Sequence, residues 1–171
     1  MSPHSSRRPV ALAIHGGAGV IERGSLGHDV EAAIHADLAR TLDVGHVILA
    51  TGGTALDAVE AAVTVLEDSP YFNAGRGAVF TAEGRHELDA AIMDGRHRRA
   101  GAVAGVMTVR HPVRLARRVL EDSPHVFLIG DGAEQFADTQ PGIERMPNGW
   151  FSTEARRAQL RDAQQREQQA W

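Results

Sequence analysis

Short apolar runs are the feature that most limits how this chain can fold. Val10–Ile14 and Val126–Ile129 are apolar throughout, and Gly101–Val109 is almost entirely so. Strands with this composition are typical of a sheet whose two faces are both covered. Two shorter strands are predicted at Ala78–Thr81 and Leu88–Met93, on either side of a glycine turn.

Helical patterns lie between these runs. Each predicted helix has an apolar stripe or a start signal. Two are predicted at Asp29–Val47 and from Pro112 to Leu120, and a third is capped by Thr54 with Asp57. A fourth opens at Asp131, which forms a capping-box pattern with Glu134, and the last starts at Ser152 or Thr153. Helices and strands mix without strict alternation. This order favours a layered α+β fold over a doubly wound sheet.

Composition excludes several classes of protein. The chain has 171 residues, enough for one domain, and no cysteine, so disulfides and thiolate chemistry are impossible and a reducing cytoplasm is compatible. Its net charge of -4 argues against a nucleic-acid partner, and the basic run Arg96–Arg99 is typical of a solvated turn. The apolar run before His15 is too short for a membrane span or a signal sequence.

The two ends of the chain differ from the rest. Residues 1–9 predict a disordered leader, and residues 10–160 carry the folded pattern. After Leu160 the sequence is polar on all sides. A helix without an apolar face has little to hold it, so residues 161–171 are expected to fray and to begin a disordered linker.

Two glycine loops are candidate sites. Gly16-Gly17-Ala18-Gly19 follows a predicted strand and permits close approach of a ligand, but it matches neither common nucleotide-binding glycine motif and is equally a tight turn. Asn73 opens the second loop, Asn73–Gly77. Its amide can bind a substrate or a catalytic amine, or simply cap a turn. The residues alone leave both choices open.

Other catalytic patterns are weak or missing. Glu87, Asp89 and Asp94 invite comparison with a glycosidase carboxylate pair, although acidic residues beside a turn are commonly solvated or capping. None of the nine histidines has zinc-ligand spacing, and no serine lies in a nucleophile elbow.

Taken together, five stretches resemble the plant-type asparaginase/isoaspartyl peptidase family of N-terminal-nucleophile (Ntn) hydrolases. They are AIHGGAG at Ala13–Gly19, the segments Gly52–Asp68 and Phe72–Gly95, AGAVAGV at Ala100–Val106, and SPHVFLIGDGAEQFA at Ser123–Ala137. The resemblance implies a four-layer αββα sandwich, of which this chain supplies the N-terminal half.

The resemblance also implies a mechanism. Such a precursor cleaves itself ahead of a threonine, whose hydroxyl attacks an amide carbonyl while its own α-amine accepts the proton. None of the threonines in this chain lies in the family's context for that residue, so the chain is expected to be the α subunit, active only with a β subunit from the same precursor in an (αβ)2 heterotetramer. The implied substrates are L-asparagine, hydrolysed to aspartate and ammonia, and β-aspartyl dipeptides.

Few of the family's functional positions fall in this chain. Asn73 is similar to the asparagine beside the nucleophile, and Gly16 and Gly17 match the turn that approaches the same site. The resemblance further implies a structural sodium ion held by backbone carbonyls, which suit a hard cation; the matching positions are Leu66, Glu67, Ser69, Phe72, Ala74 and Arg76. The rival hypotheses are a small-ligand or nucleotide-binding α/β module that uses the turn at Gly16–Gly19, and an inactive scaffold.

Overall fold

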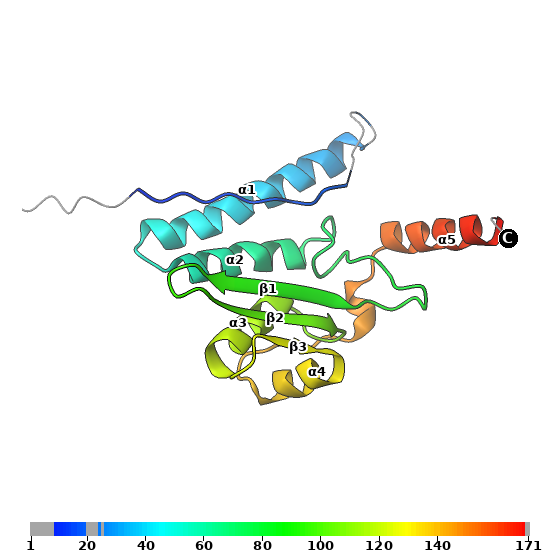
Figure 1. The fold of residues 1–171 in the computed structure, drawn as a ribbon. Helices are drawn as coiled ribbons and strands as arrows, with labels where there is room; N and C mark the ends of the chain where they lie inside the picture. The colour runs from blue at the N-terminus through cyan, green and yellow to red at the C-terminus, as the bar shows by residue number, and fades with distance from the viewer. Residues whose placement is uncertain (1–8, 20–23, 25, 170–171) are drawn as a thin grey trace, which may run out of the picture.

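The computed structural model of the chain describes residues 9–19, 24 and 26–169. Helices pack on one face and along the edges of a small sheet (Figure 1). The elements are α1 His28–Ala50, α2 Ala55–Asp68, β1 Leu88–Asp94, β2 Arg99–Val106, α3 Pro112–Asp122, β3 Phe127–Ile129, α4 Gly130–Thr139, the 3-10 helix η1 Asn148–Phe151 and α5 Glu154–Gln169.

The sheet has the order β1-β2-β3 and mixes both kinds of pairing. β1 and β2 form an antiparallel hairpin, with a register shift between Leu88 and Ala90. β2 and β3 are parallel, and α3 makes the crossover that a parallel pair requires. The combination of helices with a mixed sheet confirms the α+β class.

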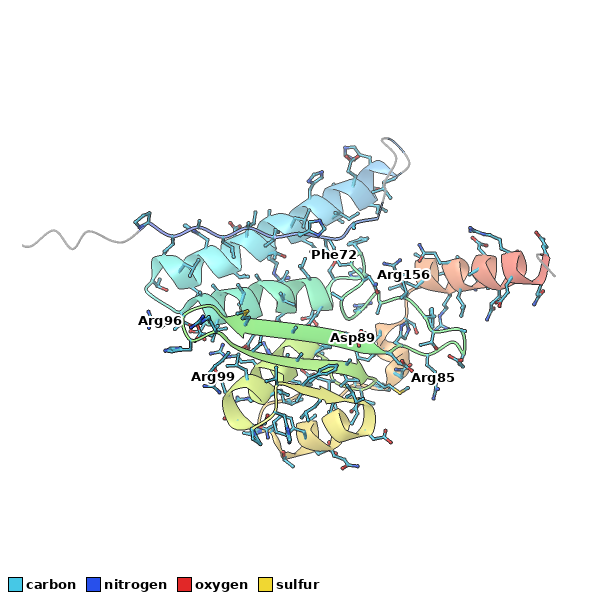
Figure 2. All side chains as sticks on the ribbon, viewed as in Figure 1. Phe72, Arg85, Asp89, Arg96, Arg99 and Arg156 are labelled. Carbon is cyan, nitrogen blue, oxygen red and sulfur yellow. The ribbon has the colours of Figure 1, made fainter. Side chains whose placement is uncertain are left out.

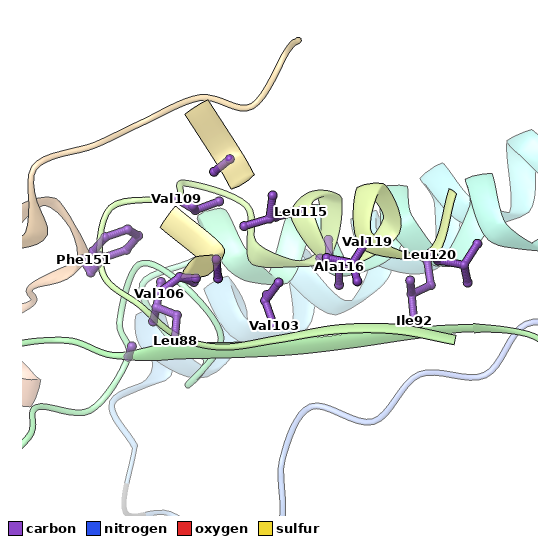
Figure 3. Close-up of a cluster of buried hydrophobic side chains, with 14 residues drawn as sticks. Leu88, Ile92, Val103, Val106, Val109, Leu115, Ala116, Val119, Leu120 and Phe151 are labelled. Carbon is purple, nitrogen blue, oxygen red and sulfur yellow. The ribbon is translucent and has the colours of Figure 1, made fainter. Parts of the chain in front are cut away.

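The core lies between α3 and one face of this sheet (Figure 3). Val103 and Val106 of β2 face Leu115, Ala116 and Val119 of α3, and all five side chains are completely buried. α3 begins with Pro112 in its first turn, where the missing backbone N–H has no helical partner to lose. Phe151 of η1 closes one end of the cluster.

The opposite face of the sheet is open and apolar. One row of side chains crosses the three strands on this face, because Ala91 pairs with Ala102 and Ala102 pairs with Phe127. Ile129 lies opposite Ala104 in the next row. Phe127 and Ile129 are 55% and 62% exposed. Within the described part of the chain, the expectation that both faces are covered is therefore met on one face only.

Two predicted strands are wrong. Val10–Ile14 is irregular and runs along α1 (Figure 1), where Leu12 packs so closely over Gly45 that a Cβ on Gly45 would lie 2.5 Å from the leucine side chain. Ala78–Thr81 is irregular, because Val79 N–H donates to the Asn73 side chain and Thr81 N–H donates to the carbonyl of Arg85. These bonds use backbone groups that a strand ladder needs.

The predicted helices are confirmed, with different ends. Thr54 and Asp57 form the expected reciprocal capping box of α2. The capping box predicted at Asp131 and Glu134 does not form, and α4 begins at Gly130 without a side-chain cap. The carboxylate of Glu134 is used elsewhere, because it accepts hydrogen bonds from the backbone N–H groups of Met107 and Thr108. β2 ends at Val106, three residues earlier than predicted.

α5 starts after Thr153 as predicted and continues to Gln169. Residues 161–169, where the polar sequence predicts fraying, are helical with exposed side chains, and their assignment to a linker stays a prediction. The predicted leader lies outside the described residues except for Pro9. Among the helices that the structure describes, none has the length and apolar character needed to span a membrane.

Candidate active-site loop

The segment between α2 and β1 folds back on the end of α2. Arg76 N–H donates to the carbonyl of Glu67 at 2.7 Å, which closes the Leu66–Arg76 loop. Gly75 passes so close to this carbonyl that a Cβ at Gly75 would lie 2.5 Å from its oxygen. Ser69-Pro70 ends α2, since proline cannot continue the backbone ladder. The six positions matched by resemblance to a cation site thus lie on one closed loop.

Three other elements hold this loop from outside. The hydroxyl of Ser69 donates to the carboxylate of Asp37 in α1 at 2.5 Å. Just after the loop, Gly77 N–H donates to the carbonyl of Phe151 in η1 at 2.8 Å, and the Gly77 carbonyl accepts from Arg156 of α5 at 2.6 Å. The loop is therefore fixed to three parts of the chain that are distant in sequence.

Asn73 lies on this fixed loop. Its side-chain oxygen accepts the N–H of Val79 at 2.9 Å, which is the turn-capping role that the sequence left open. Within the described residues the amide nitrogen of Asn73 donates no hydrogen bond. The oxygen thus fixes the orientation of the side chain and leaves the N–H groups available, so the capping role and a substrate or nucleophile contact are compatible.

The glycine turn meets the loop through Phe72. The Phe72 ring is nearly buried, and a Cβ on Gly16 would lie 3.0 Å from its edge and 3.5 Å from Leu38. Gly17 adopts φ +133°, a conformation that side chains strongly disfavour. Gly16 thus permits the close approach that brings the first glycine motif against Phe72, the residue before Asn73. Figure 2 shows Phe72 on the same side of the molecule as Arg156.

The loop fits a hard cation in one respect. In the described part of the chain, the carbonyls of Ser69, Phe72, Ala74 and Arg76 accept no hydrogen bond, while those of Leu66 and Glu67 accept the N–H groups of Ser69 and Arg76. The described residues contain no cluster of three or more His, Asp or Glu side chains suited to a metal. A cation at this loop would therefore depend on its carbonyl oxygens.

The side chain of Glu67 is a feature that sequence reasoning missed. It is 2% exposed and lies against His111, which is 5% exposed. Burial raises the pKa of the Glu67 carboxyl above its ordinary value. A signal was present in the sequence: Glu67 follows Val59 and Val63 at helical spacing, so a charged residue occupies the apolar stripe predicted for α2.

Asp89 and Asp94 do not form a catalytic pair. Asp89 accepts the N–H of Gly105 at the irregularity between β1 and β2. Asp94 accepts from Arg96 N–H and lies 2.6 Å from His97, a contact that holds the pKa of its carboxyl below the usual value. The two residues sit near opposite ends of β1, about 16 Å apart at the rise of a strand. Glu87 is exposed on the same side as Asp89, as the alternation predicted.

The alternative hypothesis, a small-ligand or nucleotide-binding module that uses the turn at Gly16–Gly19, is not supported by the position of the groove in the structure. An open groove of about 1260 Å³ lies between the start of α2 and the β1–β2 turn, and it is lined by Gly52, Gly53 and Thr54, among others. The turn at Gly16–Gly19 does not line this groove.

Comparison with known proteins gives a consistent answer. A family model described as asparaginase matches residues 8–171. The isoaspartyl peptidase of Salmonella typhimurium is 52% identical over 149 residues, which are 87% of this chain and 47% of that protein. The human isoaspartyl peptidase/L-asparaginase is 43% identical over 152 residues, 89% of this chain and 47% of that protein.

A plant relative agrees. The probable isoaspartyl peptidase/L-asparaginase 2 of Arabidopsis thaliana is 43% identical over 144 residues, 84% of this chain and 43% of that protein. The chain spans a little under half the length of these relatives. The family model covers nearly the whole chain, and the identities extend across most of it. The chain therefore belongs to the asparaginase family.

Proposed function

We propose that this chain is the α subunit of an isoaspartyl peptidase/L-asparaginase that hydrolyses L-asparagine to aspartate and ammonia and cleaves β-aspartyl dipeptides. The observation that carries the proposal is the match of residues 8–171 to the asparaginase family, together with 52% identity to a protein named isoaspartyl peptidase. The chain spans less than half of that relative. In the proposal, the activity belongs to an assembly of this chain with a β subunit.

The open sheet face supports the need for this second half. Its rows of Ala91, Ala102 and Phe127, and of Ala104 and Ile129, form an apolar surface of the kind that packs against another sheet. In the proposed assembly a sheet of the β subunit covers this face and completes a four-layer αββα sandwich. Two such αβ units form the proposed heterotetramer. The chain has no cysteine, which suits the cytoplasm that we propose as its location.

The proposed chemistry divides between the two subunits. A threonine exposed at the start of the β subunit by autoproteolysis attacks the substrate amide carbonyl, and its own α-amine accepts the proton. The side-chain oxygen of Asn73 accepts Val79 N–H with one lone pair. Its second lone pair can accept an N–H of the α-amine, which orients the amine and leaves its own lone pair free to take the proton. In the proposal Gly16 and Gly17 form the turn that approaches the same site; a larger residue at Gly16 would meet Phe72, and Gly17 supplies the positive φ of the turn.

A structural sodium ion is part of the proposal. The carbonyls of Leu66, Glu67, Ser69, Phe72, Ala74 and Arg76 would hold it, which would stiffen the loop that carries Asn73. No side-chain charge is needed for such ligation, so Ser69 and Arg76 are compatible with it. The supporting observation is the closed loop, in which four carbonyls remain without a hydrogen bond in the described residues.

The function is tested with the protein expressed from its complete coding sequence. Ammonia release from L-asparagine and aspartate release from a β-aspartyl dipeptide are measured, with a control in which the first threonine of the β subunit is replaced by alanine. The proposal expects turnover of both substrates by the native protein and none by the control. A cleaved, folded protein that releases neither product would refute the proposal.

A further inference from the structure

The side chain of Glu67 joins the end of α2 to the start of α3. One carboxylate oxygen accepts the N–H of Val113 at 2.9 Å, a buried hydrogen bond in the first turn of α3. The other oxygen lies 3.4 Å from Nδ1 of His111, the residue that precedes α3. A carboxylate at this place satisfies a backbone donor that the helix itself cannot satisfy.

The backbone of Glu67 joins a third segment to the same point. Its carbonyl accepts Arg76 N–H at 2.7 Å and touches Gly75, so Glu67 holds the far end of the Leu66–Arg76 loop. Glu67 therefore connects three parts of the chain: the last turn of α2, the first turn of α3 and the end of the loop at Arg76. Displacement of its side chain would tilt the peptide that carries the loop-closing carbonyl.

Neighbouring contacts reinforce this junction on its exposed side. Arg110 donates to the carboxylate of Asp68 at 3.1 Å and to that of Glu144 at 2.9 and 3.0 Å. These three side chains are partly exposed, and exposed ion pairs contribute little to rigidity. The buried contacts of Glu67 are therefore the dominant connection between the loop and α3.

We propose that Glu67 is a positioning residue, held by Val113 and His111, that sets the placement of the Leu66–Arg76 loop and of Asn73 on it. The proposal rests on the proposed function, in which Asn73 orients the nucleophile. Glu67 touches neither substrate nor nucleophile in this arrangement, and its effect reaches the reaction through the loop. The hydrogen bond from Val113 N–H carries this effect, so an uncharged acceptor of the same shape can replace the carboxylate.

The test compares four variants of the protein expressed from its complete coding sequence. Glu67→Ala removes the side chain, Glu67→Asp draws the carboxylate back by about 1.5 Å, the length of one carbon–carbon bond, and Glu67→Gln preserves the acceptor for Val113. The matched control is Glu134→Ala. The carboxylate of Glu134 likewise accepts backbone N–H groups, those of Met107 and Thr108, but Glu134 lies outside the loop.

Two measurements separate positioning from stability. Steady-state kinetics of the cleaved protein give kcat and KM. Hydrogen exchange at the amides of Arg76 and Gly77 reports loop closure without any substrate. We expect Glu67→Asp to lower kcat about tenfold with KM within twofold, and to speed exchange at both amides about tenfold. Glu67→Gln should stay within twofold of the native protein, and Glu134→Ala should lower the melting temperature with kcat and loop exchange unchanged.

The contribution of His111 is tested by a double-mutant cycle. If His111 acts through Glu67, the Glu67→Asp/His111→Ala double variant loses no more kcat than Glu67→Asp alone. Additive losses would show that His111 acts separately and would overturn its part in the proposal.

The remaining outcomes each decide the issue. Native kcat and native exchange in Glu67→Asp would overturn the proposal, as would equal kcat losses in Glu67→Asp and Glu134→Ala. If Glu67→Ala does not fold, Glu67→Asp still gives the answer. If the native protein shows no turnover, the proposed function fails, whereas the exchange rates continue to test the junction by themselves.

Discussion

Substitution of Gly75 by alanine tests the loop closure directly. The new Cβ would lie 2.5 Å from the carbonyl oxygen of Glu67 and 3.0 Å from its Cβ. The shortfall against an ordinary contact of 3.4 Å is 0.9 Å. Glu67 cannot move aside without breaking its hydrogen bonds to Arg76 and Val113. The loop must therefore shift outward by about the same distance.

The expected magnitude follows from this shift. Overpacking of this kind costs about 1–3 kcal/mol, which corresponds to a fall in melting temperature of roughly 2–6 °C for a protein of several hundred residues. A displacement near 1 Å at a residue that orients a nucleophile lowers turnover by about tenfold to a hundredfold. Gly75→Ala should therefore reduce kcat for ammonia release much more than it reduces the folded fraction.

The matched control is Gly132→Ala in α4. No atom lies within 4 Å of a Cβ at Gly132, and the residue is helical, so alanine should leave turnover unchanged and stabilise the protein by about 0.5–1 kcal/mol. Thermal unfolding and steady-state ammonia release are measured on both variants. Native stability and native turnover in Gly75→Ala would refute the closed loop described above.

Three further predictions follow from other parts of the chain. Asn73→Ala should lower turnover about tenfold or more while costing roughly 1 kcal/mol for its lost hydrogen bond to Val79; full turnover in a cleaved variant would leave Asn73 as a turn residue only. Burial lowers the pKa of His86 below its ordinary 6.5, so at pH 6.5 and above the ring is mainly neutral in the folded protein. Its contribution to stability is present above pH 6.5 and is lost as pH falls toward the lowered pKa. The fall in melting temperature below pH 6.5 should therefore be shallower in His86→Gln, and identical profiles would contradict this. Residues 1–171 expressed alone should be insoluble or lack a cooperative thermal transition, because Phe127 and Ile129 stay exposed. Cooperative unfolding of a soluble monomer would contradict the proposal that a β subunit must cover the open face of the sheet.

Local signals in the sequence predicted the parts of the fold that local interactions control. The Thr54 and Asp57 pair predicted the start of α2 because both of its hydrogen bonds lie within four residues. The strand at Leu88–Met93 and the helix from Pro112 could also be predicted, because their signals are local in the sequence. Val10–Ile14 has the composition of a buried strand, but composition does not provide a pairing partner, and in this chain the segment packs on α1.

The candidate site was predictable only in part. The resemblance identified Gly16 and Asn73 as parts of one site, and the structure brings Gly16 against Phe72, the residue before Asn73. The junction of Glu67 with Val113 depends on contacts between residues 46 positions apart. No local pattern encodes such a contact, although a charged residue in an apolar stripe was a sign that one exists.

Intact-mass analysis with N-terminal sequencing tests the central claim most directly. It is applied to the protein purified after expression from its complete coding sequence. The proposed α subunit predicts two chains in equal amounts, the first containing the residues described above and the second beginning with threonine. A single uncleaved chain that nevertheless releases ammonia from L-asparagine would contradict the division into subunits.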